Sequence, residues 1–371
     1  MALLAVAAVS ARLLAEAARR DGFEAVALDC FGDVDTRRAA REWHATCKAG
    51  EALRIDGERV LALLRDLAAQ GEAAGWIAGA GFEPLPDVLE AGAALLPLIG
   101  CPPAVWRRVT APRIFFGRLD ALGIAHPEVR FDAPPRATGW LRKDEGGHGG
   151  WHVRPASERD SGDARHYFQR EAPGLPMSAA FLADGRSARL LGCNEQRLQR
   201  IGARRFVFAG VLGPVVLAPA AARAVEATVQ SLVREFGVVG LASLDFLLDG
   251  EAPSVLELNP RPSASMALYG DGLLRAHVRA CRDGVLPDVA LPPGIAGHAI
   301  VYAPRALRLS DAGAGRLAAL PFAHDLPAAG TRLAAGNPLC SHDARADDRA
   351  ALLEHLAAQR AAIDALLETT A

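Results

Sequence analysis

The stretch 240–261 constrains the fold most, because it places charged side chains inside two short apolar runs. The runs cover 241–248 and 254–259, and a cluster of turn-forming residues separates them. Asp245 interrupts the first run and Glu257 interrupts the second. We therefore expect a β-hairpin that carries one carboxylate in each strand.

A carboxylate inside an apolar strand is costly unless something pairs with it, so two on neighbouring strands suggest a shared cation. Side chains alternate faces along a strand, so Glu257 and Asn259 point the same way. The oxygen ligands Asp245, Glu257 and Asn259 suit Mg²⁺. The alternative is that both carboxylates face solvent on a half-exposed hairpin. Pro260 ends the second strand, and Arg261 follows with a fork that fits a phosphate or carboxylate.

The charge balance argues against a polyanionic partner. The 371 residues include 41 basic and 43 acidic side chains, for a net charge of −2, and 51% of the residues are hydrophobic. These values predict a globular chain of two or three lobes that binds no nucleic acid. The apolar run 1–9 has no basic flank and is too short to span a membrane, so we expect a buried first strand and no membrane partner.

The cysteines indicate neither a zinc site nor disulfides. They lie far apart, with no Cys-x-x-Cys and no Cys/His spacing of a metal site. We expect reduced thiols in a cytoplasmic protein. The six residues are Cys30, Cys47, Cys101, Cys193, Cys281 and Cys340.

Strand and helix patterns alternate over 1–106 and predict an α/β lobe. Ser10 is expected to cap the first helix, between strands at 3–9 and 23–28. The turn 79–81, Gly-Ala-Gly, is half of a dinucleotide-binding fingerprint. It lacks the third glycine, so we expect a turn without a cofactor, which disfavours an oxidoreductase.

The remainder predicts α+β architecture. We expect a second domain at 107–290, with a lid subdomain at about 135–170. Strands and a terminal helix at 291–371 would complete the same lobe. The polar trio 194–196 is expected at the end of a strand, as either a strand terminus or a ligand clamp.

A glycine-rich loop follows Lys143. The chain has only two lysines, Lys48 and Lys143, and uses arginine at its other basic positions. Glycines allow positive φ and close backbone approach, so exposed N–H groups can wrap a phosphate, and Lys143 adds a charge at the base of the loop. The alternative is a flexible hairpin tip. The loop is Gly146, Gly147, His148, Gly149 and Gly150.

Taken together, Lys143 with its glycine loop, the segment 169–174, Asp245 and the segment 257–261 resemble the ATP-grasp ligases in order and spacing. The resemblance covers 107–282 and implies an ATP-grasp fold behind a Rossmann-like pre-ATP-grasp domain. It also implies ATP and Mg²⁺ as cofactors and an acyl-phosphate mechanism.

The resemblance assigns roles to individual residues. Lys143 and the loop would cover the phosphates, and Arg261 would hold the transferred group. The usual second ATP-binding lysine is absent before Gly123, and Arg113 is the nearest substitute. The backbone of Glu171, Ala172 and Pro173 would hydrogen-bond the adenine edge, and Ser178 would also bind the cofactor.

The segments 174–182 and 193–196 resemble the branch that includes the tyramine–glutamate ligase of methanofuran biosynthesis. The segments 10–12 and 29–37 are similar to relatives in methylotrophic bacteria. This branch implies glutamate as the carboxylate and tyramine or tyrosine as the amine. The residues expected to contact them are Ser10, Arg12, Asn194, Gln196, Arg204 and Arg205; the two last could instead be surface charges.

Other activities remain open at this point. A carboxylase or phosphotransferase on the same scaffold, or a ligase for another amino acid or a pterin, would share the nucleotide motifs. A non-catalytic nucleotide sensor is disfavoured by the intact set of acidic residues. The expected partners are small-molecule substrates, and a homodimer is left open.

Overall fold

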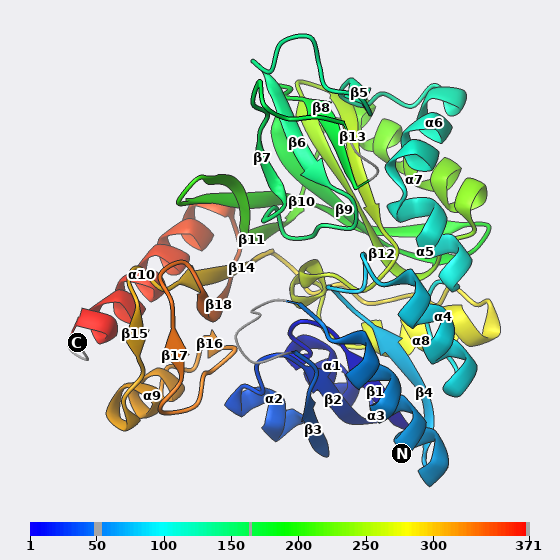
Figure 1. Ribbon diagram of the computed structural model, residues 1–371. Coiled ribbons are helices and arrows are strands. Elements are labelled where there is room, and N and C mark those ends of the chain that lie inside the picture. The colour runs from blue at the N-terminus through cyan, green and yellow to red at the C-terminus, as the bar shows by residue number, and fades with distance from the viewer. Residues whose placement is uncertain (48–53, 163–164, 369–371) are drawn as a thin grey trace.

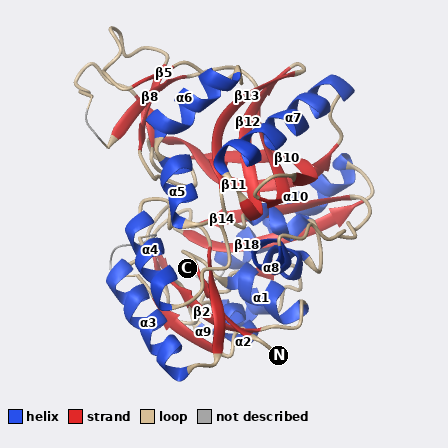
Figure 2. Cartoon of the chain, turned by 90° about the vertical axis from the view of Figure 1, so that its right-hand side faces the viewer, coloured by secondary structure: helices blue, strands red, loops and turns tan. Residues whose placement is uncertain are grey.

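The computed structural model describes residues 1–47, 54–162 and 165–368; Lys48 lies outside them. Figure 1 shows the N-terminal lobe below, the lid sheet above, and the C-terminal strands and helix on the left. The large sheet connects these parts, and Figure 2 shows helices on the outer faces of the lobes.

The N-terminal lobe is a parallel sheet in the order β3-β2-β1-β4. The central strand β1 is buried along its whole length, which explains its uninterrupted apolar sequence. The expected α/β architecture is present, and β3 is a strand that the charged sequence did not predict. The strands are β1 Leu3–Ala7, β2 Glu24–Asp29, β3 Glu42–Ala45 and β4 Ala73–Ala78.

The prediction that Ser10 caps the first helix is wrong. The helix begins after Ala11, whose N–H donates to the Asp29 carboxylate at 3.1 Å, while Ser10 Oγ donates to Asp325. A carboxylate from the neighbouring strand thus takes the capping role. The helices of this lobe are α1 Arg12–Arg20, α2 Val34–Ala39, α3 Gly57–Gln70 and α4 Pro86–Leu95.

The prediction of six reduced thiols is also wrong. Cys30 and Cys47 form a disulfide, with their Cα atoms 4.8 Å apart. They follow the ends of β2 and β3, which pair in parallel and so bring their carboxyl ends together. Cys101, Cys193, Cys281 and Cys340 are free.

The large sheet has eight strands in the order β13-β12-β9-β10-β11-β14-β18-β16. Its neighbours pair antiparallel, and strands from beyond residue 290 extend the sheet that carries the carboxylate hairpin. The strands are β9 Leu175–Asp184, β10 Ala188–Ile201, β11 Arg204–Val215, β12 Val239–Asp249, β13 Ala252–Asn259, β14 Ile295–Tyr302, β16 Ala323–His324 and β18 Pro338–Ala346.

The polar trio 194–196 does not end a strand, because β10 continues to Ile201. Asn194 is fully buried and accepts a hydrogen bond from Tyr269 Oη at 2.6 Å. Glu195 is buried and paired with Arg349 at 2.9 Å. Partners that are distant in the sequence therefore allow polar residues to continue inside the sheet.

The lid is a separate four-stranded sheet in the order β5-β8-β6-β7. Its strands are β5 Val129–Arg130, β6 Trp140–Asp144, β7 Val153–Pro155 and β8 His166–Arg170. A two-stranded pair, β15 Leu307–Arg308 with β17 Arg332–Leu333, lies in the C-terminal part.

One apolar core joins the N-terminal lobe to the large sheet. It includes Trp76 of the parallel sheet, Phe116, Phe181 and Phe236, each 3% exposed or less. The remaining helices are α5 Pro103–Thr110, α6 Pro112–Leu122, α7 Pro219–Phe236, η1 Ala264–Leu268, α8 Leu273–Asp283, α9 Asp311–Ala318 and α10 Arg349–Glu368.

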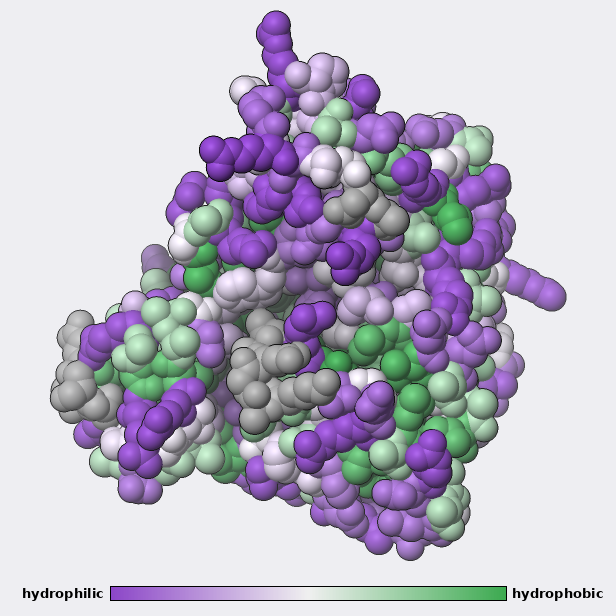
Figure 3. All heavy atoms as spheres, in the orientation of Figure 1, coloured by the Kyte–Doolittle hydropathy of each residue, from purple (hydrophilic) through white to green (hydrophobic). Residues whose placement is uncertain are grey.

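Hydrophilic side chains cover most of the face seen in Figure 3, with apolar residues in small patches between them. Among the described helices, none has the length and apolar character needed to cross a membrane.

Candidate functional site

The hairpin of β12 and β13 brings the predicted metal ligands together. Asp245 lies opposite Glu257 in the register, and Asn259 lies opposite Ser243. The Asn259 amide donates to Asp245 at 3.3 Å and to Glu257 at 3.4 Å. The two carboxylates and the amide thus form one polar cluster, in which the amide nitrogen faces the carboxylates and Asn259 Oδ1 accepts from Arg261 at 3.1 Å. Leu258 points into the core.

Electrostatics favour a cation at this cluster. Burial, and then the neighbouring Glu257 carboxylate, raise the pKa of Asp245 well above its ordinary range. Lys143 of the lid is 6% exposed, and burial lowers its pKa although both carboxylates act to raise it. A divalent cation between Asp245 and Glu257 would relieve their repulsion, so the residues fit Mg²⁺.

A cavity of about 350 Å³, here called the lid cavity, lies between the lid and the large sheet. It brings together most of the predicted nucleotide residues, which are far apart in the chain. Its walls include Lys143, His148, Gly149, Gly150, Glu171, Ala172, Ser178, Gln196, Asp245, Glu257, Asn259 and Arg261. Gly146, Gly147 and Pro173 are not among the lining residues.

The glycine loop packs closely against the protein. Gly146, Gly149 and Gly150 have φ of 68°, 62° and 75°, a region that favours glycine. A Cβ on Gly150 would lie 1.8 Å from the Phe206 carbonyl oxygen, and one on Gly147 would lie 2.1 Å from the ring of His152. The loop therefore requires glycine both for its backbone conformation and for its approach to β11.

The segment predicted to hold adenine has few free donors. The Glu171 N–H donates to the Gly139 carbonyl at 2.9 Å, and its carboxylate pairs with Arg205 at 2.6 Å. Pro173 has no N–H. Of these three residues only Ala172 could offer an amide N–H to a base, alongside the carbonyl oxygens.

Arg261 is held by a residue that the sequence reasoning missed. Glu83 is 6% exposed and lies 2.5 Å from the Arg261 guanidinium, and His148 Nδ1 is 3.9 Å from the same carboxylate. Burial acts to raise the pKa of Glu83, but Arg261 and His148 hold it below its ordinary value. The position of Glu83 just after the Gly79–Gly81 turn was the sequence signal that could have identified it.

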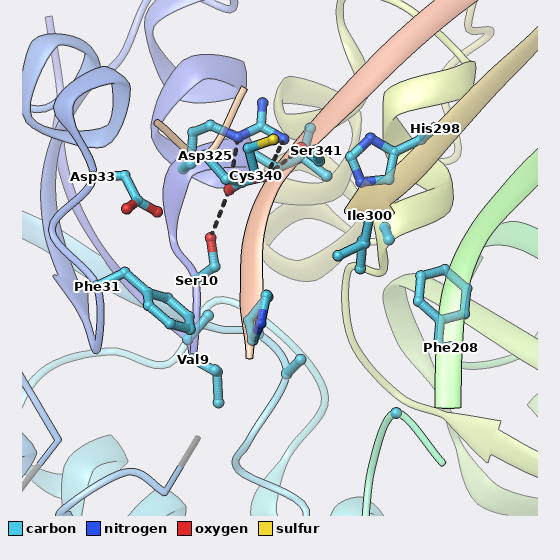
Figure 4. Close-up of a pocket in the computed structure, with 18 of the residues that line it drawn as sticks. Val9, Ser10, Phe31, Asp33, Phe208, His298, Ile300, Asp325, Cys340 and Ser341 are labelled. Atoms are coloured by element: carbon cyan, nitrogen blue, oxygen red, sulfur yellow. Dashed lines mark hydrogen bonds and ion pairs between the residues drawn. The ribbon is translucent and has the colours of Figure 1, made fainter. Parts of the chain in front are cut away.

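A second cavity of about 300 Å³, here called the interlobe cavity, lies where the N-terminal lobe, the large sheet and the C-terminal strands meet (Figure 4). It shares Ala80, His148, Gly149, Phe208, Arg261, Ser263 and Ala264 with the lid cavity. Its other walls include Ser10, Arg12, Phe31, Asp33, His298, Tyr302, Asp325 and Ser341.

Ser10 and Arg12 line this cavity, but both have partners. Arg12 Nε donates to Asp325 at 2.9 Å, and Arg12 Nη1 donates to Glu16 at 2.8 Å. Burial acts to raise the pKa of Asp325, yet Arg12 and a hydrogen bond from Ser341 keep it below its ordinary range. The backbone of Asp325 has φ of 52°, an uncommon conformation outside glycine that is often found at functional positions.

Several other predicted residues contact protein groups instead of lining either cavity. Arg113 is exposed and stacks on Phe131, 4.1 Å from the ring centre. Arg204 donates to the Trp151 carbonyl, and Arg205 pairs with Glu171. These three arginines and Asn194 line neither cavity within the described chain.

Two histidines that the sequence analysis did not predict, His152 and His298, also line the cavities. Burial lowers the pKa of His152, in the lid cavity, to about 4. His298 Nδ1 lies 2.5 Å from Asp343 across the β14–β18 pair. The two strands are separated by more than 30 residues, so the pair had no local sequence signal.

Comparison with known proteins identifies an ATP-grasp match in the same region of the chain. Residues 115–265 match the model of a family described as an ATP-grasp domain. The carbamoyl phosphate synthase large chain of Kocuria rhizophila is 32% identical over 146 residues, which are 34% of this chain. The chain spans only 13% of the length of that protein.

Solved structures resemble nearly the whole chain. The L-amino acid ligase of Bacillus licheniformis has a TM-score of 0.72 at 14% identity, with 96% of each chain covered. Rhizobium etli pyruvate carboxylase has a TM-score of 0.75 at 16% identity, covering 96% of this chain and 37% of that protein. The chain therefore has the ATP-grasp fold, with an ATP-grasp domain over residues 115–265.

Proposed function

We propose that the protein is an ATP-dependent carboxylate–amine ligase that forms an amide bond through an acyl phosphate. The observation that carries the proposal is the lid cavity, in which Lys143, the carboxylate cluster and Arg261 face one space. That space adjoins a second cavity along the wall that contains Arg261. Two neighbouring cavities are what a ligase with a nucleotide and further substrates requires.

The residues suit phosphoryl transfer, in which the protein mainly positions groups and neutralises charge. Asp245, Glu257 and Asn259 would hold Mg²⁺, which when bound neutralises phosphate charge. Lys143 would contact the phosphates beside the Gly149–Gly150 backbone. Arg261, oriented by Glu83, would bind the transferred group at the boundary between the cavities.

The chemistry balances without a redox partner. A carboxylate oxygen attacks the γ-phosphorus of ATP, and the bond to ADP breaks. The amine nitrogen then attacks the acyl carbon, the C–O bond to phosphate breaks, and phosphate leaves with the bonding electrons. One N–H proton is released. Burial of the cavity walls limits water access and so protects the acyl phosphate.

For the substrates we propose glutamate as the carboxylate and an aromatic amine, tyramine or tyrosine, as the acceptor. Such a reaction would belong to the biosynthesis of a methanofuran- or methylofuran-type one-carbon cofactor. The proposal rests on the resemblance of segments 174–182 and 193–196, and aromatic residues Phe31, Phe208 and Tyr302 in the interlobe cavity are compatible with a ring. The protein would act in the cytoplasm.

The test is incubation with ATP, Mg²⁺, glutamate and tyramine or tyrosine, followed by mass spectrometry for the glutamyl amide. ADP release should require both the acid and the amine. Release that instead requires bicarbonate would support the carboxylase alternative. Product with another acid or amine would keep the ligase chemistry and remove the proposed substrates.

A further inference from the structure

Acidic side chains gather at the part of the interlobe cavity that is not shared with the lid cavity. Asp33 and Asp325 line it, and Asp29 and Asp35 lie close enough to influence Asp33. Arg12 is the guanidinium in contact with this group, and Asp325 and Glu16 already bind it. Negative charge is therefore in surplus here.

Three of the four aspartates have partners in the protein. Asp29 accepts hydrogen bonds from backbone N–H groups and from Trp43 at 2.6 Å. Asp35 accepts from the backbone N–H groups of Asp325 and Leu326, at 2.7 and 3.0 Å. Asp325 itself pairs with Arg12.

Asp33 differs from the other three. Its side chain is 7% exposed, lines the cavity, and makes no hydrogen bond or ion pair with any residue of the described chain. Figure 4 shows its carboxylate beside Phe31, across the cavity from Phe208 of the shared wall. A buried carboxylate without a partner is costly, so its position at a cavity indicates a ligand.

We propose that Asp33 binds an ammonium group of a substrate, and that this ammonium is not the nitrogen that reacts. The reacting groups belong at the shared wall, where Arg261 faces both cavities. This inference rests on the proposed ligase function. It defines the substrate class as an amino acid that reacts through its carboxylate, or a diamine, with an ammonium group remote from the new bond.

The protonation of Asp33 supports this assignment. Burial, and then the negative charges of Asp325, Asp29 and Asp35, raise the pKa of Asp33 to about 8, while Arg12 opposes the rise. A bound ammonium favours the ionised carboxylate. Binding near pH 7 should therefore release a proton from Asp33.

Two substrates could supply this ammonium group. It is either the α-ammonium of glutamate, the acid substrate, or a second ammonium on the acceptor. Trapping of the acyl phosphate with hydroxylamine tests the first without an acceptor. Glutarate matches glutamate but lacks the ammonium group. If the acid supplies the charge, the wild type should favour glutamate over glutarate by about ten- to a hundredfold in kcat/KM, since a charged hydrogen bond contributes ~1.5–3 kcal/mol. Asp33→Asn should reduce that preference to below about threefold.

If the acceptor supplies the charge, hydroxamate formation should not change in Asp33→Asn. The wild type should then prefer an aromatic diamine over tyramine as acceptor, and the variant should lose the preference. Asp66→Asn is the matched control, because Asp66 is exposed in the same lobe. Asp33→Ser serves as a second variant if Asp33→Asn does not fold.

An Asp33→Asn enzyme that keeps both preferences at wild-type size overturns the inference. Absence of hydroxamate and amide in the wild type is a failure of the proposed function instead. Calorimetry then decides the inference: glutamate or the diamine should bind the wild type with proton release, measured in buffers of different ionisation enthalpy, and lose this release in Asp33→Asn. Binding without that difference would also overturn it.

Discussion

The lid cavity and the interlobe cavity adjoin each other but differ in how their charges are matched. In the lid cavity, Lys143 faces the two carboxylates of the hairpin, and the remaining negative charge suits a divalent ion. In the interlobe cavity, Asp33 has no partner in the described chain, and a bound cation would favour its ionised form. The first cavity is suited to a polyphosphate with its metal, and the second to an organic cation.

The cavities also differ in where their residues come from. Asp245, Glu257 and Arg261 lie within one hairpin and its exit, so local spacing identifies them. Ser10, Asp33 and Asp325 come from opposite ends of the chain and meet only after folding. The residues of the proposed nucleotide site are therefore recognisable from local spacing, whereas Asp33 and Asp325 of the interlobe cavity are not.

The largest effect should follow from removing a charge in the lid cavity. Glu257→Gln should preserve the fold and lower Mg²⁺-dependent ATP turnover by at least about a hundredfold, because a neutral ligand cannot balance phosphate charge. Glu251→Gln, in the exposed turn of the same hairpin, is the control. Near-normal turnover in both Glu257→Gln and Asp245→Asn would place the metal site elsewhere.

Substitution in the wall between the cavities should have the next largest effect on stability and turnover. Glu83→Gln leaves Arg261 without its buried partner, which we expect to cost about 3 kcal/mol of stability and to lower turnover about tenfold or more. Because the pKa of Glu83 is lowered in the fold, its stabilisation is present above the ordinary carboxyl pKa and is lost as pH falls through the lowered value.

The measurement for Glu83 is thermal unfolding against pH, together with turnover. Glu83→Gln should be less stable at neutral pH and should lose this acid dependence. Glu90→Gln, which removes an exposed ion pair with Arg107, should change stability by under about 1 kcal/mol. Equal effects of the two variants would contradict the role of Glu83 in orienting Arg261.

The glycine loop should give a moderate effect confined to the lid cavity. Gly150→Ala would force a Cβ against the Phe206 carbonyl at a positive φ, so the loop must move. We expect nucleotide affinity to fall about tenfold by calorimetry, the loss of ~1.4 kcal/mol. Gly117→Ala, at an open helical position, should have no effect. Unchanged affinity in Gly150→Ala would leave the loop a structural turn.

The smallest effect concerns the stability of the protein when the interlobe cavity is empty. Because the pKa of Asp33 is raised to about 8, its stabilising effect is complete below the ordinary aspartate pKa and is lost as pH rises towards 8. Asp33→Asn should remove this loss and be more stable than the wild type at pH 9, by about 1 kcal/mol or more. A variant less stable than the wild type at that pH would indicate a structural role instead.

Much of the fold was predictable because its signals are local. The alternation of strands and helices in the N-terminal lobe and the hairpin at 241–259 follow from apolar periodicity and turn residues. The continuation of β10 past Asn194 was not predictable, because the Tyr269 hydroxyl and Arg349 that satisfy its polar residues are remote in the sequence. The Cys30–Cys47 pairing depends on strand order in the same way.

For the candidate site, the sequence predicted which charged residues are present better than it predicted which residues they pair with. Arg261 was expected to be free for a phosphate, yet it shares its guanidinium with Glu83, 178 residues away. Arg205 was expected to bind substrate, yet it pairs with Glu171. Sequence shows which charges exist, but their pairing depends on tertiary distance, so isolated arginines in an arginine-rich chain are poor indicators of a substrate site.

The contact of Arg12 with Asp325 has a consequence for the order in which the molecule is made. The ribosome synthesises Arg12 of α1 313 residues before Asp325, its partner from the C-terminal part. The nascent N-terminal lobe can pair its own strands early, but the interlobe cavity cannot close until β16 and β18 have joined the sheet. Capacity to bind the proposed second substrate should therefore arise only near the end of translation, well after the carboxylate hairpin has been made.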